Sequence, residues 1–399
     1  MQMKEKIRQL ASAFSEEALA IRHHLHAHPE LSMQEQETSA FVRQKLESWG
    51  IACEGGFAVH GLKARLTGKT PAGKVVAARA DMDALPILEK NQVDYGSQNP
   101  GVMHACGHDV HMTGVLGAAW ILQQLRNEWE GTVLFLFQPS EEKNPGGASL
   151  MIRDGVLRDP RPSLVLAQHV FPELKAGEAG FFPGKYMASA DEIYITVKGR
   201  GGHAALPHLL VNPLFMAGRL LQAFQQFIEQ TLQPHPVRTV LNFGTIHGNG
   251  ATNVVPDEVT LSGTFRAMDD AWRFEVHRRL EAIAASVARE SGGAIQLRIE
   301  VGYPCLVNDE KLTNSAAAAA ADYLGAGRVK PLLPRMSSED FAFFSAELPV
   351  CFYRLGTNDE SGSFSASVHT PVFNIDESAL TTATGLMAWL LWSQLQNAL

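Results

Sequence analysis

The chain has 399 residues, more than the roughly 250 to 300 that one hydrophobic core usually organises, so two domains are expected. Hydrophobic residues make up 45% of it, enough for sizeable cores, yet no apolar run approaches the ~20 residues of a membrane span. The formal net charge is −8 with both signs mixed along the chain, which leaves no basic stripe for a phosphate backbone. We expect a soluble protein that binds neither nucleic acid nor a membrane.

The amino-terminal segment, MQMKEKIRQLASAFSEE, is charged throughout and lacks the apolar run and the small-residue cleavage site of an export signal. A cytoplasmic location is therefore expected. The four cysteines lie far apart and form no CxxC pair, so neither a disulfide scaffold nor a thiolate zinc finger is expected. Any cysteine with special chemistry acts alone.

The first part of the chain alternates predicted helices and strands. Apolar residues at helical spacing from Phe41 to Trp49 predict a helix that ends at Gly50. Three β-rich runs follow, and each becomes polar at its carboxyl end: KVVAARADMDALP, GTVLFLFQPSEE and LVLAQHVFP. Residues 111–128 read as a helix between the first two, which predicts a doubly wound α/β sheet. Ligands bind beyond the carboxyl ends of such strands. The polar residues there are Asp81, Asp83, Glu141, Glu142 and His169.

The pattern changes near residue 186. Segments that alternate as strands and segments periodic as helices then follow in the order β-α-β-β-α-β up to residue 301. This is the ferredoxin-like arrangement, of a suitable size for one inserted domain. Helix and strand signals resume afterwards, so we expect 1–185 and 302–399 to form one domain and 186–301 to be inserted in it.

The stretch MHACGHDVHM places Cys106 among three histidines. A free cysteine usually packs as a small hydrophobe, and a lone histidine is more often structural than a ligand. Here, however, Cys106, His108, Glu142 and His169 offer the thiolate, imidazole and carboxylate groups that zinc-like ions prefer. A metal site is the favoured interpretation, and a thiol nucleophile is the weaker alternative, since it would want one histidine as base rather than several carboxylates.

The pair Glu141–Glu142 ends a buried-strand pattern, although adjacent carboxylates are more often a solvated surface. Side chains of neighbouring residues point in different directions, so one can bind a metal while the other faces a water molecule. These two separate roles suit metal-assisted hydrolysis, in which a carboxylate that does not bind the metal takes a proton from the water molecule.

With these residues in view, the chain resembles the metal-dependent amidohydrolases that include hippurate hydrolase, N-acyl-L-amino acid amidohydrolase and the auxin-conjugate hydrolases, in the aminoacylase and carboxypeptidase superfamily. The resemblance covers nearly the whole chain. The segments that carry it are LHAHPELSMQEQET, ARADMDALPI, HACGHDVHMTGVLGAA, FQPSEEKNPGGA, AQHVFPELKAGE, GRGGHAALPH, TNVVPDEVTLSGTFR, MSSEDFAFF and VHTPVFNIDESAL. It implies a mixed-sheet metallohydrolase catalytic domain with an inserted ferredoxin-like α+β domain that serves as a lid and in dimerisation.

The resemblance also implies a site with two divalent metal ions. Cys106 would bridge them, and Glu141 would be the general base. The remaining ligands would be His108, Glu142, His169 and His369. The wider superfamily has His-x-Asp where this chain has Asp81-Met82-Asp83, so His108 becomes the replacement ligand, Asp83 an orienting group, and the role of Asp81 stays open.

The same resemblance implies a function for the inserted domain: it would bring His203 to the reacting carbonyl and Asn253 near the substrate. Without it, His203 reads as a turn residue in a glycine-rich loop. Arg266 could hold a substrate carboxylate in a bidentate fashion, or form a surface salt bridge. The histidine-rich HHLHAHPE tract is read as structural, because a helix scatters these side chains over different faces.

The sequence thus predicts a cytoplasmic, homodimeric or higher oligomeric enzyme that hydrolyses the amide bond of N-acyl amino acids, through a metal-bound water activated by Glu141. A metallo-dipeptidase or carboxypeptidase on the same site and a non-catalytic metal-binding scaffold are the alternatives. Intact Glu141 argues against the scaffold. Zinc and manganese both fit the ligands.

Overall fold

The structure is a computed structural model that describes residues 2–71 and 73–396. The chain divides into two compact units, each described here by itself. Unit 1 comprises Met1–Gly184, Val307–Leu333 and Asp340–Leu399, and unit 2 comprises Lys185–Leu306 and Pro334–Glu339. Unit 2 is therefore mostly one continuous stretch between two parts of unit 1.

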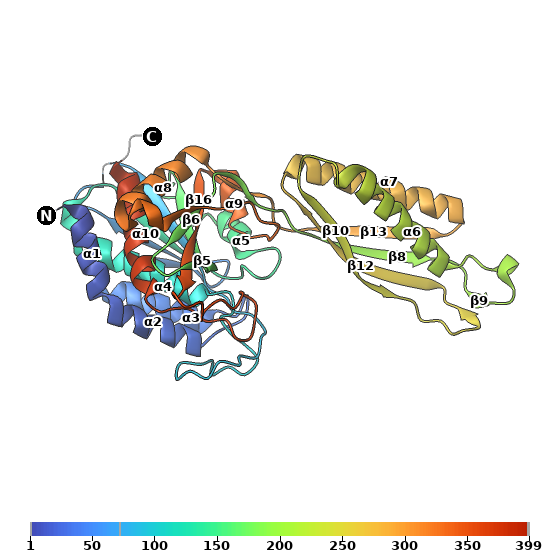
Figure 1. The fold of residues 1–399 in the computed structure, drawn as a ribbon, viewed down its shortest axis with the longest axis horizontal. Coiled ribbons are helices and arrows are strands. Elements are labelled where there is room, and N and C mark those ends of the chain that lie inside the picture. The colour runs from blue at the N-terminus through green and yellow to red at the C-terminus, as the bar shows by residue number, and fades with distance from the viewer. Residues whose placement is uncertain (1, 72, 397–399) are drawn as a thin grey trace. The chain divides into compact units, whose positions relative to one another are not determined.

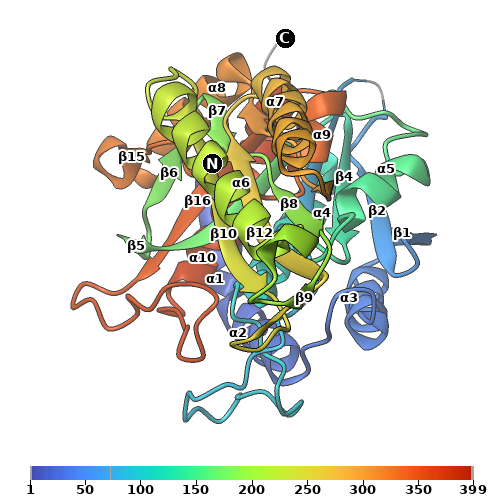
Figure 2. The same ribbon diagram turned by 90° about the vertical axis from the view of Figure 1, so that its right-hand side faces the viewer.

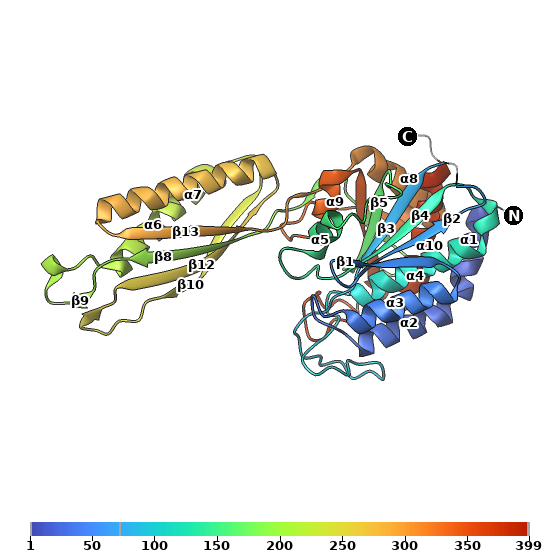
Figure 3. The ribbon, with the colours of Figure 1, turned by 180° about the vertical axis from the view of Figure 1, so that it is seen from behind.

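Unit 1 is built on an eight-stranded mixed sheet in the order β1-β2-β4-β3-β5-β16-β6-β15 (Figures 1 and 3). Its strands are β1 (Ala52–Phe57), β2 (Gly61–Thr67), β3 (Val75–Asp81), β4 (Thr132–Gln138), β5 (Val165–Lys175), β6 (Ala179–Phe181), β15 (Val329–Pro331) and β16 (Val350–Asn358). The central strands β4, β3, β5 and β16 run parallel, whereas β2 and β6 are antiparallel to their inner neighbours. Every residue of β4 is buried, as expected for a strand covered on both faces.

The helices of unit 1 cover this sheet. They are α1 (Met3–Ala13), α2 (Ser15–Ala27), α3 (Gln36–Ser48), α4 (His108–Gln124), α5 (Gly147–Arg153), α8 (Glu310–Leu324), α9 (Ala342–Glu347) and α10 (Ala379–Gln396). The helices α4 and α10 pack on each other and on β3 and β5, and α1 and α2 lie against them (Figure 3). Both α4 and α10 are apolar on nearly all sides, which is typical of helices buried within a core.

Unit 2 has the order of elements predicted from the sequence: β8 (Asp191–Lys198), α6 (Pro213–Phe227), β10 (Thr239–His247), β12 (Glu258–Ala267), α7 (Asp270–Ser291) and β13 (Ala294–Val301). The antiparallel sheet has the order β10-β12-β8-β13, the ferredoxin-like topology. Helices α6 and α7 lie side by side on one of its faces (Figures 1 and 2). Burial alternates along β8, so one face of each strand packs against these helices.

Short elements complete the chain. These are the strands β7 (Gly184–Met187), β9 (Gly202–His203), β11 (Val254–Val255) and β14 (Leu306–Asn308), the 3-10 helices Arg126–Glu128, Pro207–Leu209 and Ala326–Arg328, and the π-helix Ile228–Leu232. The predicted fold class, a mixed α/β sheet with an inserted ferredoxin-like unit, is confirmed. Among the described residues, no helix is both long and apolar enough to cross a membrane.

Candidate metal centre

The polar residues predicted to form the site follow neighbouring parallel strands. Asp81 is the last residue of β3 and lies opposite Gln138, the last residue of β4. Glu141 and Glu142 follow β4 within four residues, and β5 runs parallel to β3 on its other side. The carboxyl ends of these strands therefore meet at one sheet edge, the usual place for a ligand site in an α/β sheet.

The start of α4 brings Cys106 and His108 to the same edge. Gly107 separates them with a φ of 80°, in the left-handed region that glycine adopts without strain. A Cβ at this position would also lie 2.6 Å from the Val170 side chain of β5. The tight turn requires glycine for two reasons: its left-handed backbone angle and its close approach to β5.

All five predicted metal ligands come together in two groups that share Cys106. Its Sγ lies 3.4 Å from His169 Nε2 and 3.3 Å from His369 Nε2. Glu142 Oε1 lies 3.2 Å from His369 Nε2 and 3.9 Å from His108 Nε2. Potential ligand atoms of Cys106, His108 and His169, and again of Cys106, Glu142 and His369, lie within 4.8 Å of one another. Cys106 belongs to both groups, as the bridging ligand that the resemblance implies would, and His108 and Glu142 also belong to more than one group.

Each of the two buried histidines turns one ring nitrogen, Nε2, toward this cluster. His108 Nδ1 donates to the Asp83 carbonyl oxygen at 2.7 Å, and His108 Nε2 is buried without a hydrogen-bond partner. His169 Nδ1 donates to the Val170 carbonyl oxygen at 2.8 Å, which turns Nε2 toward the Cys106 sulfur. Metal-ligating histidines are oriented in this way, through the ring nitrogen that does not bind the ion. The residues present thus fit a divalent transition metal.

The electrostatic field of the cluster favours a cation. Burial and the nearby Glu142 and Glu141 carboxylates raise the pKa of the Cys106 thiol well above its usual range. Burial opposes a charge on His108, but Asp81 and its other carboxylate neighbours outweigh it and raise its pKa to about 10. Burial together with Arg354 lowers the pKa of His169, which keeps this imidazole neutral and able to bind a metal. A bound ion would stabilise the Cys106 thiolate and replace the His108 proton.

Asp83 holds the two glutamates through their backbone. Its Oδ1 accepts the Glu141 N–H at 3.0 Å and its Oδ2 accepts the Glu142 N–H at 2.9 Å. The Ser32 hydroxyl also donates to Oδ2, at 2.6 Å. These bonds and the contact with His108 outweigh the effect of burial and lower the pKa of Asp83. Asp83 lies where an orienting group for His108 and both glutamates is needed.

Asp81, whose role the sequence left open, binds groups behind the cluster. Its Oδ1 accepts a hydrogen bond from His111 Nδ1 at 2.6 Å, and its Oδ2 one from Arg79 Nη1, also at 2.6 Å. His111 Nε2 in turn accepts the Val170 N–H at 2.9 Å, so both of its ring nitrogens are used inside the protein. Asp81 therefore fixes His111 against β5, one residue beyond the predicted ligand His169.

In unit 2 the structure brings His203 and Asn253 together but places Arg266 far from them. The strands β9 and β11 pair His203 with Val254, and the Ala204 N–H donates to the Asn253 carbonyl oxygen at 3.0 Å. This ribbon continues from the end of the sheet where Lys198 pairs with Glu258 (Figure 1). Both His203 and Asn253 are exposed.

Arg266 lies near the other end of β12. The eight residue-to-residue steps from Glu258 to Arg266 span about 26 Å of strand. Its Nη1 donates to the Thr264 hydroxyl at 2.6 Å, and no carboxylate forms an ion pair with Arg266 among the residues that the structure describes. The surface salt bridge that the sequence allowed is therefore not formed. Arg266 and His203 of one chain are too far apart to hold the same small substrate.

Residues 77–393 match the peptidase family M20/M25/M40. The chain belongs to this family. It is 39% identical over 306 residues to the N-acyl-L-amino acid amidohydrolase of Geobacillus stearothermophilus, covering 76% of this chain and 81% of that one. It is 35% identical to the N-acetyl-L-cysteine deacetylase of Bacillus subtilis, covering 94% of this chain and 87% of that one.

Two solved structures are similar to this chain in both sequence and fold. A dinuclear metal-binding peptidase of the M20 family from Bacillus subtilis is 32% identical with a TM-score of 0.82, over 97% of this chain and all of that one. A protein from methicillin resistant Staphylococcus aureus reaches a TM-score of 0.93 at 31% identity, over 99% of this chain and 100% of that one. The family identification made from the motifs is confirmed, and so is the class of the enzyme, a hydrolase.

Three buried residues near the candidate site were not predicted from the sequence: Arg79, Gln138 and Asp340. Arg79 donates not only to Asp81 but also to Gln138 Oε1 and Asp340 Oδ1, each at 2.8 Å. The backbone N–H of Asp340 reaches Glu141 Oε1 at 3.4 Å. The spacing Arg-x-Asp on β3 and the polar SSED segment were available signals, but nothing in either indicates which distant residue it meets.

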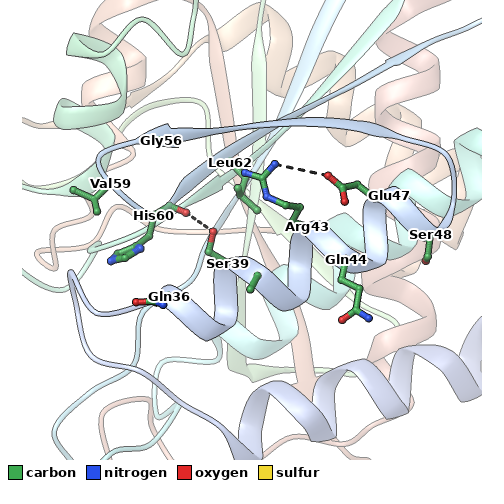
Figure 4. A pocket seen from close by; sticks show the side chains of 11 residues that line it. Gln36, Ser39, Arg43, Gln44, Glu47, Ser48, Gly56, Val59, His60 and Leu62 are labelled. Carbon is green, nitrogen blue, oxygen red and sulfur yellow. Dashed lines mark hydrogen bonds and ion pairs between the residues drawn. The ribbon is translucent and has the colours of Figure 1, made fainter.

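A separate open pocket of about 560 Å³ lies between α3 and the β1–β2 hairpin (Figure 4). In it the Ser39 hydroxyl donates to the His60 carbonyl oxygen at 2.7 Å, and Arg43 lies 3.8 Å from Glu47. Its lining includes none of the predicted site residues. This pocket therefore plays no part in the metal centre.

Proposed function

We propose that this M20 protein hydrolyses the amide bond of N-acyl amino acids at two divalent metal ions. The observation that carries the proposal is the pair of ligand groups sharing Cys106, with Glu141 beside them. Glu141 is buried, and its carboxylate forms a further close group with the His108 imidazole and the Glu142 carboxylate. Two of the relatives, the N-acyl-L-amino acid amidohydrolase and the N-acetyl-L-cysteine deacetylase, are named for N-acyl amino acid substrates, which supports this substrate class.

The ions would be held by Cys106, His108, Glu142, His169 and His369. When bound, such ions polarise an amide carbonyl and lower the pKa of water toward neutrality. Zinc and manganese both suit this mixture of thiolate, imidazole and carboxylate.

Glu141 serves as the general base. It takes a proton from the attacking water and passes it to the leaving nitrogen, as a carboxylate beside the ions but not bound to them can do. Asp83 keeps Glu141 in place through its backbone N–H. The contact from the Asp340 N–H to Oε1 restricts the carboxylate further.

Arg266 binds the substrate carboxylate. Its guanidinium is half-buried, and burial lowers its pKa. A half-buried guanidinium that forms no ion pair within the described part of the chain is free to form a bidentate pair with an incoming carboxylate. This contact selects acyl amino acids over neutral amides.

We further propose that the inserted domain, residues 186–301, acts as a lid and joins two chains in a homodimer. Arg266 and His203 of one chain cannot reach the same small substrate, so one of them acts on the substrate of the other chain. We propose that it is His203, together with Asn253. His203 then donates to the carbonyl oxygen as negative charge develops there, a contribution of about 2.7–4 kcal/mol in comparable sites.

The function is tested with purified protein loaded with zinc or manganese, on N-acetyl and N-benzoyl amino acids, the matching amino-acid amides that lack the carboxylate, and a set of dipeptides. We expect turnover of the acyl amino acids and little of the carboxylate-free analogues. Turnover of dipeptides alone would assign the protein as a peptidase. Inactivity on every substrate would leave a metal-binding scaffold.

A further inference from the structure

The side chain of Glu35 is fully buried, and its own helix does not use it. Glu35 occupies the position before α3, where a carboxylate commonly accepts N–H groups of the first turn, but it makes no such bond. Glu30 does this instead, accepting the N–H of Thr38 at 2.8 Å and that of Glu37 at 3.2 Å. Helix capping therefore does not explain why Glu35 is buried.

The Glu35 carboxylate reaches the loop that carries the base. Its Oε1 accepts the N–H of Ser140 at 2.7 Å, 105 residues away in sequence. Ser140 has a φ of 56°, a left-handed conformation that costs a residue with a side chain about 1–3 kcal/mol and persists where surrounding contacts impose it. The same residue is held on its other side, because its carbonyl oxygen accepts the Gly147 N–H at 2.8 Å.

Together, Glu35 and Asp83 bind three consecutive backbone N–H groups. Glu35 takes that of Ser140, and the two oxygens of Asp83 take those of Glu141 and Glu142. The directions in which Glu141 and Glu142 leave the backbone are therefore set from two sides.

We infer that Glu35 is a positioning residue for the reaction: by holding Ser140 it aims the Glu141 base and the Glu142 ligand at the metal centre. The inference rests on the proposed function for its catalytic part alone, since the aim of Glu142 affects metal binding whatever the substrate.

Glu35 does this in either protonation state. Burial and the neighbouring Asp83 raise its pKa to about 7, and a carboxylate or a carboxylic acid can accept the Ser140 N–H through Oε1. Within the described residues, Oε2 has no hydrogen-bond partner. A glutamine at this position keeps the accepting oxygen and the shape, so Glu35→Gln is expected to preserve the role that Glu35→Ala removes.

The chain offers a matched control. Asp154 Oδ2 accepts the N–H of Ala58 at 2.7 Å, and Ala58 also has a left-handed φ, of 45°. Asp154→Ala therefore removes the same kind of bond from a loop that carries none of the proposed site residues. Any effect shared by Glu35→Ala and Asp154→Ala is a general loss of stability.

The experiment measures amide hydrogen exchange in the 138–143 peptide, metal affinity by chelator competition, and kcat and KM separately. Misplacing a reacting group by about 1 Å costs up to 10²-fold in rate, and losing a group that orients a ligand costs 10–100-fold in metal affinity or activity. For Glu35→Ala we expect faster exchange at Ser140, kcat lowered 10–100-fold with KM within about two-fold, and weaker metal binding, all restored by Glu35→Gln. Asp154→Ala is expected to speed exchange at Ala58 alone.

Unchanged exchange at residues 140–142 in Glu35→Ala would overturn the inference, and so would faster exchange with wild-type kcat and metal affinity. If the wild-type protein hydrolyses none of the amides, the proposed function fails separately, and exchange and metal affinity still decide the role of Glu35. If Glu35→Ala does not fold, loss of kcat in a folded Glu35→Gln would also count against it.

Discussion

Glu141 and Glu142 are neighbours in sequence with different proposed tasks, and amide substitutions separate them. Glu141→Gln keeps the shape of the side chain but cannot accept a proton, so we expect kcat to fall about 10²–10⁴-fold, the usual cost of a lost general base. Metal content is expected to stay near wild type. Glu142→Gln serves as the control and is expected to lose metal. The opposite pattern in elemental analysis would mean that the two roles are exchanged.

Cys106 is expected to be a ligand rather than a nucleophile. Because it belongs to both ligand groups, Cys106→Ala should weaken binding of both ions by more than the 10–100-fold seen for outer groups. Cys351→Ala, at a fully buried thiol on β16, is the control and should retain both ions. Chelation should also abolish wild-type activity, with recovery on adding metal back. Full activity in rigorously metal-free protein would instead identify a thiol nucleophile.

The sequence indicated which functional groups the site contains, but it indicated less well which side chains are in contact. Cys106, His108, Glu142 and His169 could be grouped because polar residues follow neighbouring strands. His369 was predicted as a ligand only through the family resemblance, since 200 residues separate it from His169. Glu35 and Arg79 act through partners 105 and 261 residues away, Ser140 and Asp340, and no local pattern encodes such contacts.

The role of the glycine in the turn before α4 can be tested by substitution. Gly107→Ala forces a side chain into a left-handed backbone, at about 1–3 kcal/mol, and places its Cβ against Val170. Gly50→Ala is the matched control, because Gly50 has a φ of 73° but only an ordinary contact at 3.6 Å. We expect Gly107→Ala to lower the unfolding temperature more than Gly50→Ala and to weaken metal binding as well. Equal effects of the two substitutions would show that the Val170 contact is unimportant.

Helices α2 and α4 are joined by a buried ion pair whose strength depends on pH. His26 Nδ1 bonds Asp109 at 2.9 Å and its Nε2 bonds Glu89 at 3.1 Å. Burial opposes the charge on His26, but these carboxylates outweigh it and raise its pKa to about 9. A raised histidine pKa stabilises the fold fully below the unfolded value of about 6.5, and this contribution is lost as the pH rises toward 9.

We therefore expect the free energy of unfolding of the wild type, relative to His26→Gln, to fall by on the order of 3 kcal/mol between pH 6 and pH 9.5. Chemical denaturation at several pH values measures this difference. A difference that stays constant across the range would show that His26 is not charged in the folded protein.

The elements themselves were largely predictable, and their arrangement was less so. The runs that became β3, β4 and β5 have the apolar, β-branched composition of buried strands, and unit 2 alternates clearly. The antiparallel β1, β2 and β6 were missed, because strands that are interrupted by glycine or charged residues lack such a pattern. Residues 334–339 belong to unit 2 through contacts that the chain makes after returning to unit 1, which sequence order does not reveal.

At the scale of the whole molecule, the distance between Arg266 and His203 leads to a mixing experiment. His203→Ala and Glu141→Gln chains are each expected to be inactive. If His203 acts across the dimer, a mixed dimer contains one site with neither lesion. Random mixing should then recover about a quarter of wild-type activity, because half of the dimers are mixed and each has one intact site. Verified mixed dimers without activity would show that His203 acts within its own chain.

The order in which the chain is made bears on when the metal centre can form. The ferredoxin-like core of unit 2, residues 191–301, is continuous in sequence, so it can fold on the ribosome as soon as it emerges. Unit 1 cannot, because β16 pairs with β5 across that whole segment and α10 ends at Gln396. His369 is synthesised after every other proposed ligand. Metal loading therefore belongs to the last stage of the protein's biogenesis, and a prematurely terminated chain would carry a finished unit 2 beside a unit 1 unable to hold both ions.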